Sequence, residues 1–156
     1  MNHIFWVIPE KLAGRPGPDR VPWDVAALRA GGIGAVLSLN DGALCHPADF
    51  QVHDISYACM PMSDNAPPRP GDDVICLEVL PRAYEFVTKQ MNRQRRVLVH
   101  CSSGKDRTGL FLSYFLMRHH HLSVSEAIRA VRAVRPIAIS AMGWEAFATR
   151  VLSHFT

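Results

Sequence analysis

A short apolar run and a long apolar segment flank one loop of small and polar residues, and this arrangement constrains the fold most strongly. Val97-Leu98-Val99 has the length and β-branched content of a buried strand, whereas residues 108–119 are apolar over enough positions to form a helix. The loop between them, residues 100–107, reads His-Cys-Ser-Ser-Gly-Lys-Asp-Arg. A strand that passes through a tight loop into a helix is the unit from which α/β proteins with parallel sheets are built.

Strand-like and helix-like segments alternate along the rest of the chain, which predicts an α/β fold with a mostly parallel central sheet flanked by helices. Residues 13–18 and 63–71 are rich in Gly and Pro and are expected to be loops. Pro81 is expected to kink or break one helix, and Ser123 with Glu126 has the elements of a capping box at the start of another. The expected strands cover 3–8, 35–39, 55–62 and 97–99, and the expected helices cover 24–30, 72–91, 108–119, 123–135 and 142–155.

The size and composition of the chain limit its function classes. A length of 156 residues predicts one domain, residues 1–156, and 48% apolar residues suffice for a hydrophobic core. No apolar run approaches the about 18 residues of a membrane helix, and residues 1–10 lack a secretory pattern, so we expect a cytoplasmic protein without integral membrane association. A net charge of +3 is too weak to indicate a nucleic-acid partner. We expect a monomer, since no part of the sequence indicates an interface.

The cysteines and histidines do not indicate a metal site. The cysteines form no CxxC pair, and their spacing suits neither a zinc site nor a dense disulfide framework. Residues 119–121 are consecutive histidines, which on a helix point about 100° apart and cannot share one ion. We therefore expect no metal and no cofactor. The free thiols are expected at Cys45, Cys59, Cys76 and Cys101, one of which is a candidate for reactivity.

The loop at residues 100–107 has the features of an anion-binding site. It lies at the carboxyl end of the expected strand, which is the edge of a parallel sheet where ligands bind. Backbone N–H groups of residues 102–107 are placed to surround one phosphate-sized anion, and the following helix adds the positive end of its dipole. The same field stabilises a thiolate at Cys101, and the guanidinium of Arg107 is suited to hold two phosphate oxygens. This arrangement suits phosphoryl transfer to sulfur.

Five residues separate Cys101 from Arg107, and the segment reads His-Cys-x5-Arg-Thr-Gly from His100 to Gly109. This pattern resembles the signature of the cysteine-dependent protein tyrosine and dual-specificity phosphatases. The stretch from Phe5 to Pro18, the strand at 35–39 and the segment 131–136 are similar to other parts of small dual-specificity phosphatases. The resemblance covers most of the chain and implies a small catalytic domain of that kind.

The resemblance also implies a role for each residue of the loop. Cys101 attacks phosphorus to form a phosphocysteine intermediate, and Arg107 binds the phosphate and stabilises the transition state. Thr108 hydrogen-bonds the thiolate and assists breakdown of the intermediate, whereas His100 supports the loop from behind. The residues expected to form the substrate-binding loop are Ser102, Ser103, Gly104, Lys105 and Asp106.

The resemblance further implies that an aspartate upstream of the loop donates a proton to the leaving group. The candidates are Asp64, Asp72 and Asp73. Asp64 is the best placed, because the sequence Ser-Asp-Asn-Ala-Pro-Pro at 63–68 looks like the acid loop of family members. Asp72 and Asp73 instead suit the first turn of the following helix, where carboxylates interact favourably with the dipole.

The expected substrates are phosphoproteins that carry phosphotyrosine or phosphoserine and phosphothreonine. The alternative is a phosphoinositide, because Lys105 resembles a basic residue of family members that act on phosphoinositides and would meet a second phosphate. The other interpretation of Lys105 is a general positive field at the mouth of the site. Asp106 is expected to brace the loop or to pair with a nearby Arg or Lys, since it would repel a phosphate.

Two other function classes compete with a phosphatase. A phosphate-binding module without turnover would lack Cys101 or Arg107, but both are present. Sulfur transfer or arsenate reduction on another fold also uses a loop that begins with Cys, but rhodanese-like loops usually lack the exit Gly-x-x-Arg-Thr-Gly, and small arsenate reductases carry their Cys near the N-terminus.

The residue that orients the hydrolytic water departs from the family pattern, and the pairing of Cys101 on oxidation stays open. Many family members place Gln or Asn downstream to orient the hydrolytic water, whereas residues 137–142 offer only Ser140. Some relatives protect the nucleophile with a disulfide, which Cys45 or Cys59 would form with Cys101 on oxidation; the alternative is that both are inert packing residues.

Overall fold

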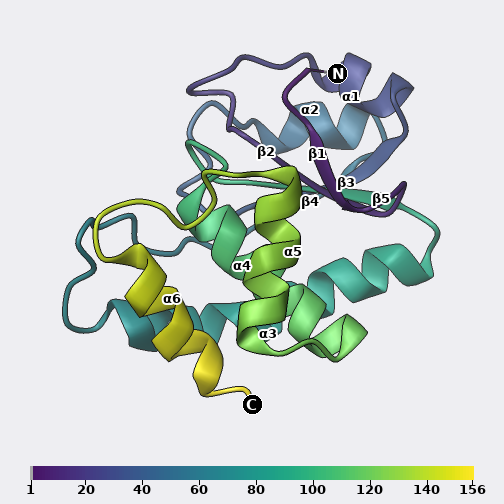
Figure 1. Ribbon diagram of the computed structural model, residues 1–156. Helices are drawn as coiled ribbons and strands as arrows, with labels where there is room; N and C mark the ends of the chain where they lie inside the picture. The colour runs from purple at the N-terminus through teal and green to yellow at the C-terminus, as the bar shows by residue number, and fades with distance from the viewer. Residues whose placement is uncertain (1) are drawn as a thin grey trace.

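One five-stranded sheet organises the computed structural model, which describes residues 2–156 (Figure 1). The strands are β1 (Phe5–Ile8), β2 (Leu12–Arg15), β3 (Ile33–Ser38), β4 (Ser56–Cys59) and β5 (Arg96–His100). Their spatial order is β1-β2-β5-β3-β4, with β1 antiparallel to β2 and every other neighbouring pair parallel. The predicted α/β fold with a mostly parallel sheet is therefore confirmed.

Helices cover both faces of this sheet, and Figure 1 shows one group above it and one below it. The short helices α1 (Val25–Ala30) and α2 (Pro47–Val52) lie on one face. The other face is covered by α3 (Asp72–Asn92), α4 (Asp106–His120), α5 (Val124–Val134) and α6 (Trp144–Ser153).

Strand β5 lies at the centre of the sheet, and hydrophobic clusters cover both of its faces. Val97 and Val99 pack in the larger hydrophobic cluster beside α3 to α6, whereas Leu98 packs in the smaller cluster beside α1 and α2. All three side chains are completely buried. A strand that is covered on both faces needs a continuous apolar run, which is the pattern that the sequence has there.

The N-terminal part differs from the sequence prediction in two places. A loop is predicted over 13–18, but Leu12–Arg15 forms the buried strand β2 between β1 and β5. Gly14 is suited to this strand, because the ring of Phe5 and the methyl group of Thr108 occupy the space that a side chain would need. Helix α2, which begins with a proline in its first turn, lies in a segment for which no element is predicted.

Helix α3 is continuous from Asp72 to Asn92 although Pro81 lies inside it, so the break considered at Pro81 does not occur. Proline removes one helical hydrogen bond, but Leu80 and Ala83 are completely buried against the core, and this packing maintains the helix across the proline. The other predicted helices and strands are present, with shifted ends. None of the helices within residues 2–156 combines the length and the apolar character needed to cross a bilayer.

The capping box predicted before α5 is confirmed. The Ser123 hydroxyl accepts a hydrogen bond from the Glu126 backbone N–H at 3.2 Å, and the Glu126 carboxylate accepts one from the Ser123 backbone N–H at 2.9 Å. These bonds satisfy donors that a helix N-terminus otherwise leaves unpaired. They fix where the chain turns from the end of α4 into α5.

Candidate active site

The loop between β5 and α4 places Cys101 at the carboxyl end of the central strand. The thiol is 2% exposed, and the Thr108 hydroxyl donates a hydrogen bond to its sulfur over 3.0 Å. Gly104 has a φ of 61°, which glycine adopts without strain, and it turns the chain back toward α4. Asp106 begins α4, so the positive end of that helix dipole faces the loop.

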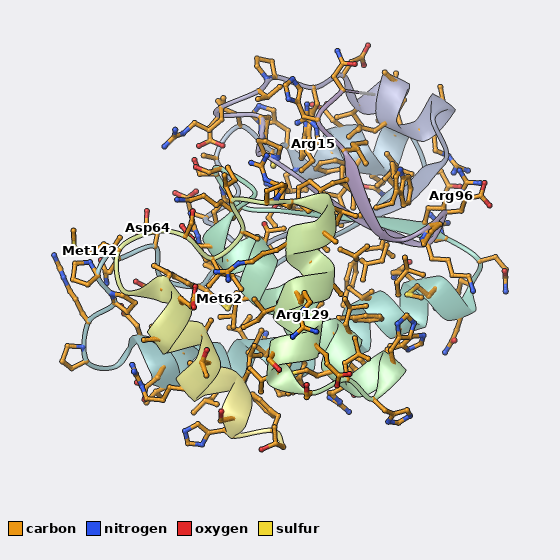
Figure 2. All side chains as sticks on the ribbon, viewed as in Figure 1. Arg15, Met62, Asp64, Arg96, Arg129 and Met142 are labelled. Carbon is orange, nitrogen blue, oxygen red and sulfur yellow. The ribbon has the colours of Figure 1, made fainter. Side chains whose placement is uncertain are left out.

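A cavity of about 190 Å³ opens above this loop and brings the predicted residues together. Its lining includes Cys101 and Arg107 from the loop. It also includes Asp64 from the segment between β4 and α3, and Figure 2 shows Asp64 toward the surface of the molecule. Arg20 and Trp144 also line it, and neither is among the residues predicted for the site. No local pattern marks them, since both come from segments distant in sequence. The other lining residues are Ser102, Ser103, Lys105 and Asp106.

Arg107 is a buried cation that lacks a protein partner. Its side chain lies in the cavity wall and is 9% exposed. Within residues 2–156 its guanidinium makes no hydrogen bond and no ion pair, whereas buried charges in proteins are normally paired. The cavity is therefore arranged for an anion, which would supply the missing partner and accept two hydrogen bonds from the planar guanidinium.

Segments from both ends of the chain brace the loop at residues 100–107, which is called the phosphate loop after its predicted ligand. The Gly17 backbone N–H donates to the Ser102 carbonyl over 2.8 Å. Arg135, at the end of α5, donates to the carbonyls of Ser103 at 2.7 Å and Gly104 at 3.2 Å. These contacts of Arg135 keep the two loop carbonyls turned outward. The loop N–H groups are thereby left free to face the cavity.

His100 supports the loop from behind through a chain of hydrogen bonds. Its Nδ1 lies 2.9 Å from the carbonyl oxygen of Cys101, which only accepts, so Nδ1 carries the proton. Burial lowers the pKa of His100 to about 4, so the ring is neutral and Nε2 accepts a hydrogen bond from the Ser38 hydroxyl at 2.6 Å. The Tyr57 hydroxyl in turn donates to Ser38 at 2.7 Å. A residue on β4 thus helps to fix the carbonyl of Cys101.

The low pKa of His100 makes the stability of the fold depend on pH. Its pKa of about 4 in the folded state is below the ordinary value of 6.5, so the unfolded chain binds the proton first as the pH falls. This contribution is complete above pH 6.5 and is lost toward pH 4, by about 3 kcal/mol in total. Urea unfolding of the wild type and of His100→Asn at both pH values measures it, and an equal pH dependence in the two proteins would contradict it.

The aspartates of residues 63–68 and of the next helix have different environments. Asp64 is exposed at the rim of the cavity. Asp72 is 8% exposed and accepts hydrogen bonds from the Arg69 backbone N–H at 2.7 Å and from the Asn65 side chain at 3.0 Å. Burial by itself raises the pKa of Asp72, but these hydrogen bonds outweigh it and hold the pKa below its ordinary value. Asp72 is thus a brace of the loop that carries Asp64, and it is unsuited to donate a proton.

Lys105 and Asp106 interact with each other at the mouth of the cavity. Their charged groups lie 3.5 Å apart, and the second oxygen of Asp106 accepts a hydrogen bond from the Ala141 backbone N–H at 3.1 Å. Asp106 thus pairs with Lys105 and joins the start of α4 to the segment before α6. The pair also reduces the positive charge that Lys105 presents to a substrate.

A thiol, an unpaired guanidinium and an aspartate that share one cavity above a central strand define the class of cysteine-based phosphatase domains. The family model for the catalytic domain of dual specificity phosphatases matches residues 24–146, and the chain belongs to this family. The alternatives of a sulfur-transferring or arsenate-reducing fold are therefore wrong.

Curated relatives include proteins with different named activities. The chain is 30% identical to human dual specificity protein phosphatase 12 over 118 residues, which are 76% of this chain and 33% of that protein. It is 25% identical to phosphatidylglycerophosphate phosphatase PTPMT1 of Arabidopsis thaliana over 128 residues, which are 80% of this chain and 36% of that protein. The chain thus spans about a third of the length of these relatives.

Solved structures show the same fold at low sequence identity. Tk-PTP in its active form superposes with a TM-score of 0.78 and 19% identity, over 97% of each chain. PTPMT1 in complex with PI(5)P superposes with a TM-score of 0.77 and 13% identity, over 98% of this chain and 96% of that one.

Proposed function

We propose that this chain hydrolyses phosphomonoesters on proteins, at phosphotyrosine and at phosphoserine or phosphothreonine, through a phosphocysteine intermediate. One observation carries the proposal: the Cys101 thiol and the unpaired guanidinium of Arg107 line the same cavity. Its volume of about 190 Å³ is sufficient for the phosphate group of such a substrate. The protein phosphatases among the relatives support this substrate class.

In the first step, the sulfur of Cys101 attacks phosphorus in line with the ester oxygen. An S–P bond forms, the P–O bond breaks, and the bonding electrons leave with the oxygen. Arg107 and the backbone N–H groups of the loop hold the remaining phosphate oxygens and stabilise the charge of the transition state. Asp64, at the rim of the same cavity, donates a proton to the leaving oxygen.

In the second step, water attacks the phosphocysteine and releases inorganic phosphate. Asp64 has lost its proton in the first step and now accepts one from the attacking water. The sulfur leaves as a thiolate, and the hydroxyl of Thr108 stabilises it by donating a hydrogen bond, as it does at 3.0 Å in the resting site. Ser140, the only hydroxyl of residues 137–142, is exposed and does not line the cavity, so we assign it no part in placing the water.

Release of phosphate from a matched panel of substrates tests the proposal. A phosphotyrosine peptide, a phosphothreonine peptide and a soluble phosphoinositide are offered to the wild type in the presence of a metal chelator. We expect turnover of both peptides at rates within about ten-fold of each other, because the loop and Arg107 bind the phosphate that the two peptides share. Turnover of none of the three would contradict the phosphatase assignment.

A phosphoinositide substrate is the second candidate, because Lys105 and Arg20 line the cavity beside Arg107. These side chains would meet a second phosphate on an inositol ring. The pairing of Lys105 with Asp106 at 3.5 Å weakens this interpretation, since part of its charge is already compensated. Preference for the phosphoinositide in the panel, reduced by Lys105→Ala without an effect on the peptides, would favour this second candidate.

If Asp64 is the general acid, the loss of rate in Asp64→Asn depends on the leaving group of the substrate. Asp64→Asn is expected to slow hydrolysis of a phosphothreonine peptide by about 10²-fold or more, because an alkoxide leaves poorly without a proton. An aryl ester with an acidic leaving group needs no proton and is expected to lose much less. Asp73→Asn is the matched control, since Asp73 lies in the first turn of α3 and outside the cavity. Equal losses on alkyl and aryl esters would remove Asp64 from the acid role.

A further inference from the structure

A second cavity, of about 1060 Å³, lies where the end of α4 meets α5 and α6. Its lining contains no residue of the phosphate loop. The floor is apolar and is formed by Met117, Leu122, Ile128 and Phe155, which pack on the main hydrophobic cluster. Cavities of about 300–1,000 Å³ with an apolar lining and a few polar groups, situated between helices, are typical of small-molecule sites.

The rim of this cavity is positively charged. Arg118, Arg129 and Arg132 line it, and Glu145 is the carboxylate among its lining residues. Arg132 pairs with Glu145 at 2.9 Å. The other two arginines form no ion pair within residues 2–156, although the nearby Glu126 carboxylate, whose pKa is lowered by its hydrogen bonds to Ser123 and by Arg129, offsets part of the charge of Arg129. The rim therefore carries an excess of positive charge above an apolar floor.

The two unpaired arginines are held differently. The Arg118 guanidinium lies 4.0 Å above the ring of Tyr84 and donates to the Tyr114 hydroxyl at 2.8 Å, so its position is fixed. Arg129 is exposed and makes no side-chain hydrogen bond to any of residues 2–156. Figure 2 shows Arg129 on α5, well separated from Asp64 at the active site. A ligand at this rim would thus be recognised outside the catalytic cavity.

Arg132 connects this cavity with the phosphate loop. Besides Glu145, it donates to the carbonyls of Ala138 at 3.0 Å and Ile139 at 3.2 Å. The Ile139 backbone N–H donates in turn to the carbonyl of Lys105 at 3.2 Å, at the start of α4. Ile139 itself has a φ of 60°, a strained value for a β-branched residue, so its position depends on these surrounding contacts. A change in the partners of Arg132 would therefore act on the catalytic loop.

We infer that this second cavity binds an amphipathic anion, a small molecule with an acyl-like apolar body and one carboxylate or similar anionic head. The body lies on the floor of Met117, Ile128 and Phe155, and the head meets Arg129 and Arg132. By competing with Glu145 for Arg132, the ligand alters the support of the phosphate loop. The effect of the ligand on the phosphate loop rests on the proposed phosphatase function, whereas the binding of the ligand does not.

Calorimetric titration with decanoate, at concentrations where it is monomeric, tests the binding. Acetate has the same head without the body, and decyltrimethylammonium has the same body with the opposite charge. We expect saturable binding of decanoate alone, weakened about ten-fold or more by Arg129→Glu, which replaces an attractive charge by a repulsive one. Arg93→Glu makes the same change at an exposed residue outside the cavity and is expected to leave the affinity unchanged.

Three outcomes would overturn the site: no binding of decanoate, equal binding of decyltrimethylammonium, or binding only where decanoate aggregates. Phosphate release from a soluble phosphopeptide, measured with and without saturating decanoate, tests the coupling. We expect kcat to change by about two-fold or more, and less in Arg129→Glu at the same decanoate concentration. Binding with an unchanged kcat would overturn the coupling, and a protein that binds decanoate but releases no phosphate would overturn the proposed function and leave the site standing.

Discussion

Replacement of Cys101 by serine is expected to lower phosphate release by about 10⁴-fold or more, since removal of a catalytic nucleophile costs up to about 10⁶-fold in other enzymes. The serine hydroxyl occupies nearly the same space beside Thr108, so binding of phosphate is expected to persist. A hydroxyl is a far weaker nucleophile than a thiolate when no base is present to activate it. Single-turnover and steady-state phosphate release, together with mass detection of the phosphoenzyme, measure the loss.

Cys59→Ser is the matched control for this prediction. Cys59 is an exposed thiol that donates to the Asn40 carbonyl at 3.3 Å, and a serine hydroxyl can make the same hydrogen bond. Its activity is expected to equal that of the wild type. If Cys101→Ser kept more than about a hundredth of the wild-type rate, catalysis would not proceed through that sulfur.

Replacement of Arg107 by lysine is expected to lower kcat by about 10³-fold although the positive charge is retained. Lysine offers a point charge, whereas the planar guanidinium holds two oxygens of the transition state at once. An arginine that stabilises a phosphoryl-transfer transition state is worth about 10³–10⁵-fold in rate. Arg150→Lys, at an exposed position on α6, is the control. Comparable rates for Arg107→Lys and the wild type would exclude the bidentate role.

Arg107→Met is expected to abolish turnover with little effect on stability. Because the Arg107 guanidinium faces the cavity and has no protein partner within residues 2–156, the free energy of unfolding is expected to change by less than about 1 kcal/mol. Inorganic phosphate is expected to stabilise the wild type against urea and to have little effect on this variant. Loss of stability in Arg107→Met would mean that the side chain has a structural partner instead.

The strand–loop–helix unit around Cys101 is the part of the site most accessible from sequence, because it is local. The apolar run at 97–99, the turn at Gly104 and the start of α4 lie within a few residues, so their pattern fixes the loop. The buried strand β2 is harder to predict. Leu12–Arg15 contains a glycine and precedes a Pro-rich stretch, and its extended form depends on pairing with β5 far along the chain.

The remaining parts of the site depend on contacts between distant segments. Arg20 approaches the phosphate loop by donating to the Ser102 hydroxyl at 3.2 Å, and Trp144 is fixed by donating to the Asn65 carbonyl at 2.9 Å. Neither contact joins residues that a local pattern relates. The support of His100 by Ser38 and Tyr57 likewise requires three neighbouring strands to be in register. Such residues can be assigned to the site only when the topology of the fold is known.

The two braces of the phosphate loop also bear on when the site forms during synthesis. Gly17 leaves the ribosome early, whereas Arg135 is translated well after Cys101 has emerged. A nascent chain that ends before residue 135 therefore lacks the contacts that hold the carbonyls of Ser103 and Gly104 outward. Domains fold largely as units once most of their sequence is available. The loop around Cys101 is accordingly completed late in translation, after Arg135 at the end of α5 has been synthesised.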